Sequence, residues 1–235
     1  MQRITNMFRG LVGNRRLLAV FLVLAASSVL FMIAASEVME GETLAFDRWI
    51  LLAMRSPGNP AIPIGPIWLR SAMTDITALG GYTTIIIINL AAIGYLLAVR
   101  RRGLAIYIAG AVLSGLAGST LLKLDYLRPR PELVARLVEV HTSSFPSGHA
   151  MNAAITYLTL GSLLAGTERN RLVRLYVMSV AIFLTVAIGI SRVYLGVHWP
   201  SDVLVGWSLG GVWAFLCAAV FAELQRRHKI GFRPE

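Results

Sequence analysis

Long apolar runs, separated by short connections that carry most of the charge, dominate this chain. Six of the runs are long enough to cross a bilayer, or nearly so, because a spanning helix needs about 17 to 25 residues at about 1.5 Å each. They cover residues 17–35, 79–99, 103–122, 146–165, 172–190 and 203–222. This pattern predicts an all-α integral membrane bundle of six transmembrane helices.

The connection 36–78 has a different pattern. Its apolar residues first recur at positions i, i+3, i+4 and i+7 beside Asp47 and Arg48, as in a short amphipathic helix: Phe46, Trp49, Ile50 and Ala53. Prolines and glycines interrupt residues 57–66, and a second amphipathic piece follows around Trp68. We expect the first piece to lie in the headgroup plane, anchored by Trp49. The connection serves either as a surface cap on the bundle or as a lateral gate that admits lipid, and amphipathicity alone favours neither.

The composition agrees with a membrane protein. Of the 235 residues, 56% are hydrophobic and only 14% are charged, whereas a soluble domain carries roughly 25% charged residues. We expect one membrane domain over 1–235, with N-terminal helices and the interfacial cap in 1–103, a core in 104–222 and a tail in 223–235. The first run is longer than the roughly 7–15 apolar residues of a cleaved signal, so we expect it to remain as a span.

The net charge of +10 could suggest a nucleic-acid partner, but the distribution of the basic residues argues against one. They gather at the ends of alternate runs, in the four clusters Arg3 to Arg16, Arg100 to Arg102, Arg169 to Arg174 and Arg226 to Arg233. The positive-inside rule makes that face cytoplasmic. Both termini are then cytoplasmic, and the connections 36–78, 123–145 and 191–202 face outward. The expected partner is the lipid bilayer, and no pattern specifies an oligomeric state.

Polar clusters in these outward connections carry the candidate chemistry. The first contains Lys123 and Arg130, the second is a Pro-Ser-Gly-His sequence that ends at His149, and the third contains Arg192, His198 and Asp202. Three cations, two imidazoles and one carboxylate suffice to move a phosphoryl group through a covalent intermediate. Because the acids are scattered and neither histidine has a second His or Cys near it in sequence, we expect no metal and no cofactor.

His198 is the expected nucleophile. A neutral imidazole can attack phosphorus with one ring nitrogen when the other is held as a donor. Asp202 follows four residues later, in the first turn of a helix that begins near Pro200, and is placed to hold that nitrogen. His149 is the expected general acid, which protonates the leaving oxygen and then activates water.

Lys123, Arg130 and Arg192 form the expected phosphate clamp, because guanidinium groups fit phosphoryl oxygens bidentately and lysine adds a point charge. Ser147 is expected to contribute its hydroxyl to an anion site at the N-terminus of the fourth run. We leave Arg128 out of the core site, as a residue that extends to the membrane interface. Because it also precedes a proline, as Arg130 does, a role in the site stays open.

Four further residues of the outward loop have lesser expected roles. Arg136 is left out of the site for the same reason as Arg128. Asp125 and Glu132 lie between the clamp residues in sequence and are placed to orient them, and His141 is placed to approach a substrate headgroup.

The three clusters resemble the signature of the type-2 phosphatidic acid phosphatase superfamily, K-x6-RP, then PSGH, then SR-x5-H-x3-D. Here the sequence reads KLDYLRPRP from Lys123, PSGH from Pro146 and SRVYLGVHWPSD from Ser191, and the resemblance covers residues 104–222. It implies that His198 is the nucleophile, Asp202 its orienting partner and His149 the acid and base, in a metal-independent mechanism. The phosphate-binding residues that it implies are Lys123, Arg130, Ser147, Gly148 and Arg192.

On this resemblance, the expected function is a lipid phosphate phosphatase that acts at the outer face of the bacterial inner membrane through a phosphohistidine. Its substrate would be phosphatidate, phosphatidylglycerol phosphate, undecaprenyl pyrophosphate or a lipid A phosphate. Two alternatives stay open. One is a lipid-to-lipid phosphotransferase that uses the same site, and the other is a catalytically silent protein that binds or transports lipid.

Overall fold

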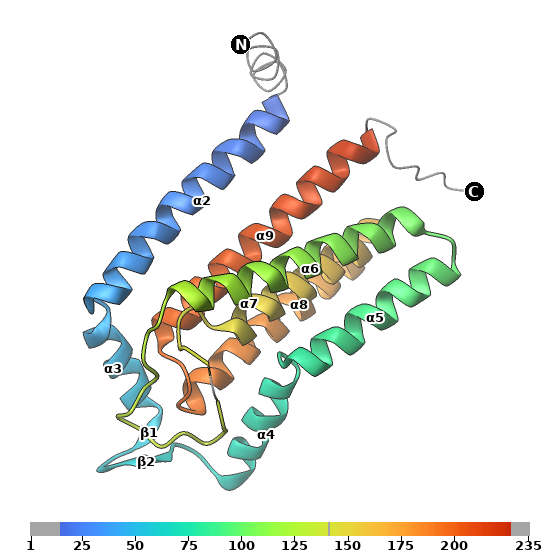
Figure 1. Cartoon of the computed structure of the whole chain (residues 1–235). Coiled ribbons are helices and arrows are strands. Elements are labelled where there is room, and N and C mark those ends of the chain that lie inside the picture. The colour runs from blue at the N-terminus through green and yellow to red at the C-terminus, as the bar shows by residue number, and fades with distance from the viewer. Residues whose placement is uncertain (1–14, 141, 227–235) are drawn as a thin grey trace, which may run out of the picture.

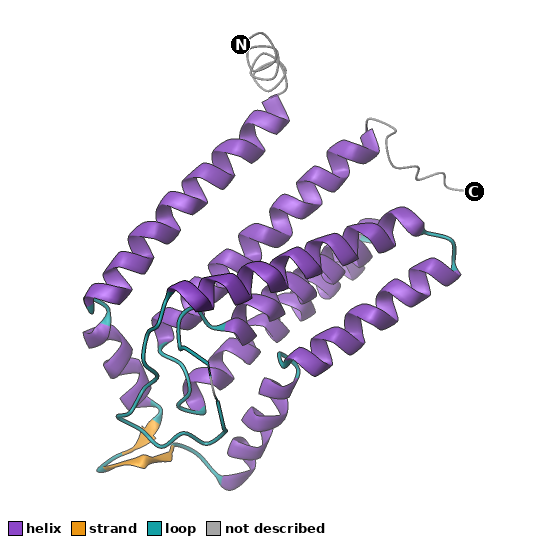
Figure 2. Ribbon diagram, in the orientation of Figure 1, coloured by secondary structure: helices purple, strands orange, loops and turns teal. Residues whose placement is uncertain are grey.

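The computed structural model describes residues 15–140 and 142–226, and most of them are helical (Figures 1 and 2). The helices are α2 (Arg15–Glu40), α3 (Leu44–Ala53), α4 (Ile67–Ala78), α5 (Tyr82–Ala98), α6 (Arg102–Asp125), α7 (Gly148–Thr167), α8 (Arg171–Tyr194) and α9 (Pro200–Arg226). Strands β1 (Arg55–Ser56) and β2 (Asn59–Pro63) pair antiparallel between α3 and α4.

A helix lies at each of the six predicted spans, but the number of spans is not confirmed. Within the described residues, four helices are long and apolar enough to cross a membrane: Leu22–Glu40 of α2, and α6, α8 and α9. Helices α4 and α5 meet that criterion only together, bent by 51° at the break between them. The structure therefore supports four or five spans, and α7, at the predicted fourth span, does not qualify by composition.

The position of α7 explains its composition. It lies among α6, α8 and α9 and packs against all three (Figure 1). It buries the polar side chains of Asn152, Thr156 and Thr159. A helix that is enclosed by other helices has little lipid-facing surface, so it does not need the all-round apolar character of its neighbours.

Glycines allow α9 to lie directly on α7. A Cβ atom at Gly210 would be 2.5 Å from the carbonyl oxygen of Met151, and one at Gly206 would be 2.8 Å from that of Ser147. Only a residue without a side chain permits this approach. As a result the N-termini of the two helices meet, and the Ser147 N–H donates to the Asp202 carbonyl over 3.0 Å.

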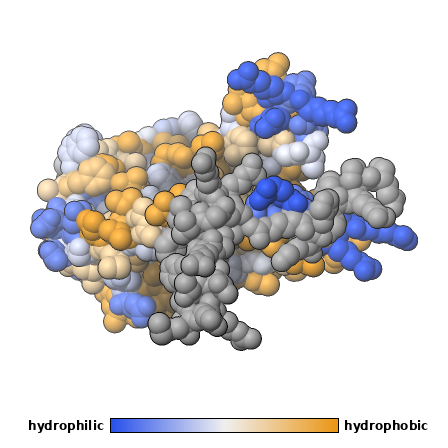
Figure 3. All heavy atoms as spheres, turned by 90° about the horizontal axis from the view of Figure 1, so that it is seen from above, coloured by the Kyte–Doolittle hydropathy of each residue, from blue (hydrophilic) through white to orange (hydrophobic). Residues whose placement is uncertain are grey.

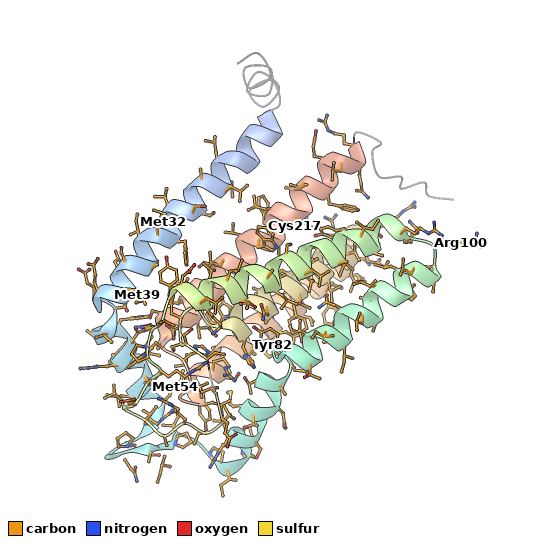
Figure 4. The ribbon with its side chains drawn as sticks, in the orientation of Figure 1. Met32, Met39, Met54, Tyr82, Arg100 and Cys217 are labelled. Carbon is orange, nitrogen blue, oxygen red and sulfur yellow. The ribbon has the colours of Figure 1, made fainter. Side chains whose placement is uncertain are left out.

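The connections divide between the two ends of the molecule. The start of α2, the end of α9 and the α5–α6 turn lie at one end, whereas α3, the hairpin and α4 lie at the other (Figure 1). Arg100 and Met54 mark these opposite ends in Figure 4. Seen from the first end, hydrophilic groups form separate patches at the rim of a largely apolar surface (Figure 3). Which membrane face each end occupies stays a prediction.

The region 36–78 differs from its prediction in two ways. Prolines and glycines do not merely interrupt helices here, because they form the hairpin β1–β2. In α3 the predicted apolar face is turned outward, with Trp49 70% exposed, while Asp47 and Leu51 are fully buried. Asp47 is buried because its carboxylate has buried partners in Ser201 and Arg128.

Candidate active site

His198 lies on the short connection between α8 and α9 and is almost fully buried. Its Nδ1 is 3.4 Å from Oδ2 of Asp202 and 3.5 Å from Oγ of Ser144. The same Asp202 oxygen accepts from the Trp199 N–H at 3.0 Å and from the Ser144 hydroxyl. The predicted pairing of His198 with Asp202 is therefore present, and it is fixed by two further donors.

Arg130 occupies the other side of the His198 ring. Its Nη1 is 3.3 Å from Nε2 and also donates to the carbonyl oxygen of Val197. A guanidinium group can only donate, and a carboxylate can only accept. The ring partners therefore assign the proton to Nδ1 and leave the lone pair on Nε2, beside the Arg130 cation.

The surroundings of His198 keep its imidazole neutral. Burial, reinforced by the positive charges of Arg130 and Arg192, outweighs the Asp202 carboxylate and lowers the pKa of His198 to about 3. Burial also lowers the pKa of Arg130, to about 10, which leaves it protonated at neutral pH. At neutral pH the site thus combines an uncharged nitrogen base with a fixed cation next to it.

A segment just before α7 holds the first two clamp residues together. Arg130 donates from Nε to the Thr142 carbonyl over 2.8 Å and from Nη2 to the Ser143 carbonyl over 3.3 Å. Lys123, in the last turn of α6, donates to the same Ser143 carbonyl over 3.0 Å. Lys123 and Arg130, seven residues apart in sequence, are thus held together because both donate to the Ser143 carbonyl.

Arg192 lies in the last turn of α8 and is 3% exposed. Its Nη1 donates to the Thr77 hydroxyl at 3.0 Å, but its Nε has no hydrogen-bond partner among the residues that the structure describes. A buried guanidinium N–H without an acceptor is energetically costly, so this group is ready to bind an anion.

The N-terminus of α7 completes the site. Ser147 caps the helix and accepts from the Ala150 N–H at 3.5 Å. A Cβ atom at Gly148 would lie 3.1 Å from Cε of Lys123, so the glycine lets the lysine lie against the first turn. The next residue is His149, and its burial, together with the positive charges of Arg192, Lys123 and Arg130, lowers the pKa of its imidazole to about 2. The three sequence clusters are thus brought to one place.

The exclusion of Arg128 from this region was wrong. Its side chain is 5% exposed and forms ion pairs with two fully buried carboxylates. Nη2 lies 2.8 Å from Oδ2 of Asp47, and Nη1 donates to Oδ1 of Asp202. From the sequence, Arg128 is indistinguishable from an interfacial arginine beside a proline. Its second carboxylate partner, Asp47, is distant in sequence and becomes evident only in the folded structure.

The remaining loop predictions have different outcomes. Arg136 is half exposed and donates to the Pro131 carbonyl, with the exposed Glu132 at 4.0 Å, so it lies outside the site as expected. Glu132 and Asp125 are both exposed. The clamp residues Lys123 and Arg130 are oriented by backbone carbonyls instead of by these two acids. His141 lies outside the described residues.

Ser144 was not predicted from the sequence. It is fully buried and contacts both Asp202 and His198. The signal that could have found it is the run of hydroxyl residues at 142–144, directly before the second cluster.

An apolar cleft of about 430 Å³ lies between α2, α3 and α9. Its walls include Leu30 and Phe31 of α2 and Val205 of α9, and its polar end is formed by Thr43 and Ser201. The cleft therefore reaches the residues that surround Asp47. Within residues 15–140 and 142–226, no group of three or more His, Cys, Asp or Glu side chains is arranged to hold a metal ion.

Comparison with known proteins identifies relatives for most of the chain. The model of the PAP2 superfamily matches residues 103–226. Phosphatidylglycerophosphatase B of Bacillus subtilis is 39% identical over 104 residues, which are 42% of this chain and 49% of that protein. Decaprenylphosphoryl-5-phosphoribose phosphatase of Mycobacterium tuberculosis is 35% identical over 133 residues, which are 55% of this chain and 68% of that protein. The match thus spans about half the length of the first of these relatives.

A solved structure extends the similarity to the N-terminal helices. The crystal structure of a transmembrane PAP2-type phosphatidylglycerolphosphate phosphatase from Bacillus subtilis superposes with a TM-score of 0.77 at 29% identity. The superposition covers 86% of this chain and 97% of that one. It therefore includes elements before residue 103, where the sequence motifs are absent.

Proposed function

The chain belongs to the PAP2 superfamily, and on that premise we propose that it is a lipid phosphate phosphatase that works through a phosphohistidine on His198. The observation that carries the proposal is the His198 ring, held between Asp202 on Nδ1 and Arg130 on Nε2. A neutral imidazole with its lone pair beside a fixed cation suits attack on a phosphoryl group.

In the first step, Nε2 of His198 forms a bond to phosphorus as the bond from phosphorus to the leaving oxygen breaks. Lys123, Arg130 and Arg192 neutralise the three non-bridging oxygens, for which the partnerless Nε of Arg192 is available. Asp202 stabilises the positive charge that develops on the ring. The negative charge of the bound phosphate offsets the clamp cations that lower the pKa of His149, so His149 can carry the proton that it gives to the leaving oxygen.

In the second step, His149 removes a proton from water, and the water oxygen attacks phosphorus. The bond between phosphorus and Nε2 breaks, which releases inorganic phosphate and returns His198 to its neutral form. The positive charges in this mechanism come from side chains, so we propose that the reaction is metal-independent.

The membrane setting supports a lipid substrate. Apolar helices bring the site to the end of the bundle, and the lining of the cleft between α2, α3 and α9 is apolar enough to suit a hydrocarbon chain. We propose that this end faces outward at a bacterial cytoplasmic membrane, because the described basic residues at 100–102 and 169–174 occupy the opposite end. The names of the relatives indicate phosphatidylglycerol phosphate and decaprenylphosphoryl-5-phosphoribose as the first substrates to test.

The proposed function predicts phosphate release by the purified protein in detergent with EDTA present. A panel of phosphatidate, phosphatidylglycerol phosphate, undecaprenyl pyrophosphate and lipid A should contain at least one substrate, with a rate that is unchanged by the chelator. Labelled donor in mixed lipid is the control: a label on a second lipid would show a transferase. Binding without turnover across the panel would contradict the proposal.

His149→Ala should lower kcat by roughly 10²- to 10⁴-fold on a lipid monoester, because the leaving alkoxide loses its proton donor. On an aryl phosphate such as p-nitrophenyl phosphate, whose leaving group is stable as an anion, phosphorylation of His198 should be much less affected. Burst kinetics with both substrates measure this difference. Equal losses on the two substrates would argue against a general acid.

A further inference from the structure

Arg128 connects two carboxylates that lie on different helices. Asp47 belongs to α3 and Asp202 to α9, and both are fully buried while Arg128 is 5% exposed. Each terminal nitrogen of the Arg128 guanidinium binds one of these carboxylates: Nη2 binds Asp47, and Nη1 binds Asp202. The Arg128 guanidinium also lies over the Trp199 ring, 5.3 Å from its centroid, which limits rotation of the fork.

The two oxygens of Asp202 have separate partners. Oδ1 accepts from Arg128, whereas Oδ2 accepts from Trp199 N–H and Ser144 and faces Nδ1 of His198. Because the terminal torsion of an aspartate is soft, its partners set the carboxylate plane. Arg128 therefore determines which oxygen is presented to the imidazole.

Asp47 in turn fixes Arg128 and the start of α9. Its Oδ1 accepts from the Ser201 N–H at 2.8 Å, and its Oδ2 accepts from the Ser201 hydroxyl at 2.7 Å and from Thr43 at 3.1 Å. Arg128 donates to the same Ser201 hydroxyl over 2.9 Å. A carboxylate at a helix N-terminus is electrostatically favourable, and here it also closes a ring of contacts around the guanidinium.

We propose that Asp47 and Arg128 are positioning residues for the reaction, such that Asp47 holds Arg128 and Arg128 holds Asp202 in the orientation that keeps the His198 proton on Nδ1. The inference rests on the proposed function. It also assigns a role to α3, a helix far from the sequence motifs, as the part of the interfacial cap that completes the site.

The test uses variants that preserve burial. Asp47→Asn is isosteric and removes one charge, and Arg128→Lys keeps its charge but loses the fork that reaches both carboxylates. The third variant combines both substitutions, Asp47→Asn and Arg128→Lys. The matched controls are Glu132→Gln and Arg136→Lys, which alter an exposed arginine–carboxylate pair on the same end of the molecule.

Each single variant should lower kcat by roughly 10- to 100-fold, as loss of an outer-shell partner typically does, with KM changed by less than about threefold. The double variant should be no worse than Arg128→Lys alone, because the two residues act through one contact. The control variants should stay within about twofold of the wild type. Additive losses, or losses confined to KM, would overturn the inference even if the wild-type enzyme hydrolyses lipid phosphate normally.

A second readout does not depend on turnover. With 15N-labelled histidine, the nitrogen chemical shifts of His198 should report protonated Nδ1 in the wild type and in both controls. In Asp47→Asn and Arg128→Lys, the shifts should move toward a mixture of tautomers. Unchanged shifts in folded variants would overturn the positioning role, whereas absence of phosphatase activity in the wild type would overturn only the proposed function.

Discussion

His198→Ala is expected to lower kcat by roughly 10⁵-fold or more, because the reaction loses its nucleophile as well as the group that Asp202 and Arg130 orient. The residual rate would come from the cationic clamp alone. With 32P-labelled substrate, rapid acid-free quenching should trap a labelled protein for the wild type and none for the variant. The label should be stable to base and labile to acid, as a phosphoramidate is.

The control for this experiment is a substitution at the same end of the molecule that leaves the ring untouched. Thr74→Ala changes an exposed hydroxyl of α4 that donates to the Arg70 carbonyl, so its turnover and labelling should match the wild type. Labelling that persists in His198→Ala would place the covalent intermediate on another residue and remove the central step of the mechanism.

Asp202→Asn is expected to lower kcat by roughly 10⁴-fold, the size of effect seen when an orienting carboxylate beside a catalytic histidine becomes an amide. The asparagine can turn its NH2 group toward Nδ1, which favours the tautomer whose proton is on Nε2 and so blocks the attacking lone pair. It also removes one of the two carboxylates that Arg128 binds. The protein should therefore unfold at a lower temperature as well.

The two effects of Asp202→Asn can be separated. Asp47→Asn also removes one carboxylate from Arg128 but leaves Asp202 in place, so it serves as the control for stability. A much larger loss of kcat in Asp202→Asn than in Asp47→Asn, at similar melting temperatures, isolates the tautomer effect. Equal activity losses in the two variants would mean that Asp202 acts mainly through the fold.

The sequence pattern was least informative for the region that contains α3, β1, β2 and α4. Spacing along α3 correctly indicated a short helix, yet its polar side carries the fully buried Asp47. An aspartate surrounded by apolar residues reads as solvent-facing because burial of an unpaired charge is costly. Its partners, Arg128 and Ser201, are more than 80 residues away in sequence, so no local pattern could reveal that the charge is paired.

The chain's sequence alone determined that this is a helical membrane protein, because the length of an apolar run reflects the thickness of a bilayer. It also determined the three polar clusters, because residue type and spacing specify their chemistry without reference to packing. It also predicted the pairing of His198 with Asp202, because four residues across a helix start is a local distance. The tertiary structure decided what depends on contacts between distant segments: that α7 is enclosed, that Ser144 and the 142–143 carbonyls hold the site, and that Arg128 is buried between two acids. Those outcomes depend on which helices meet, and hydrophobicity, which is non-directional, does not encode the partner.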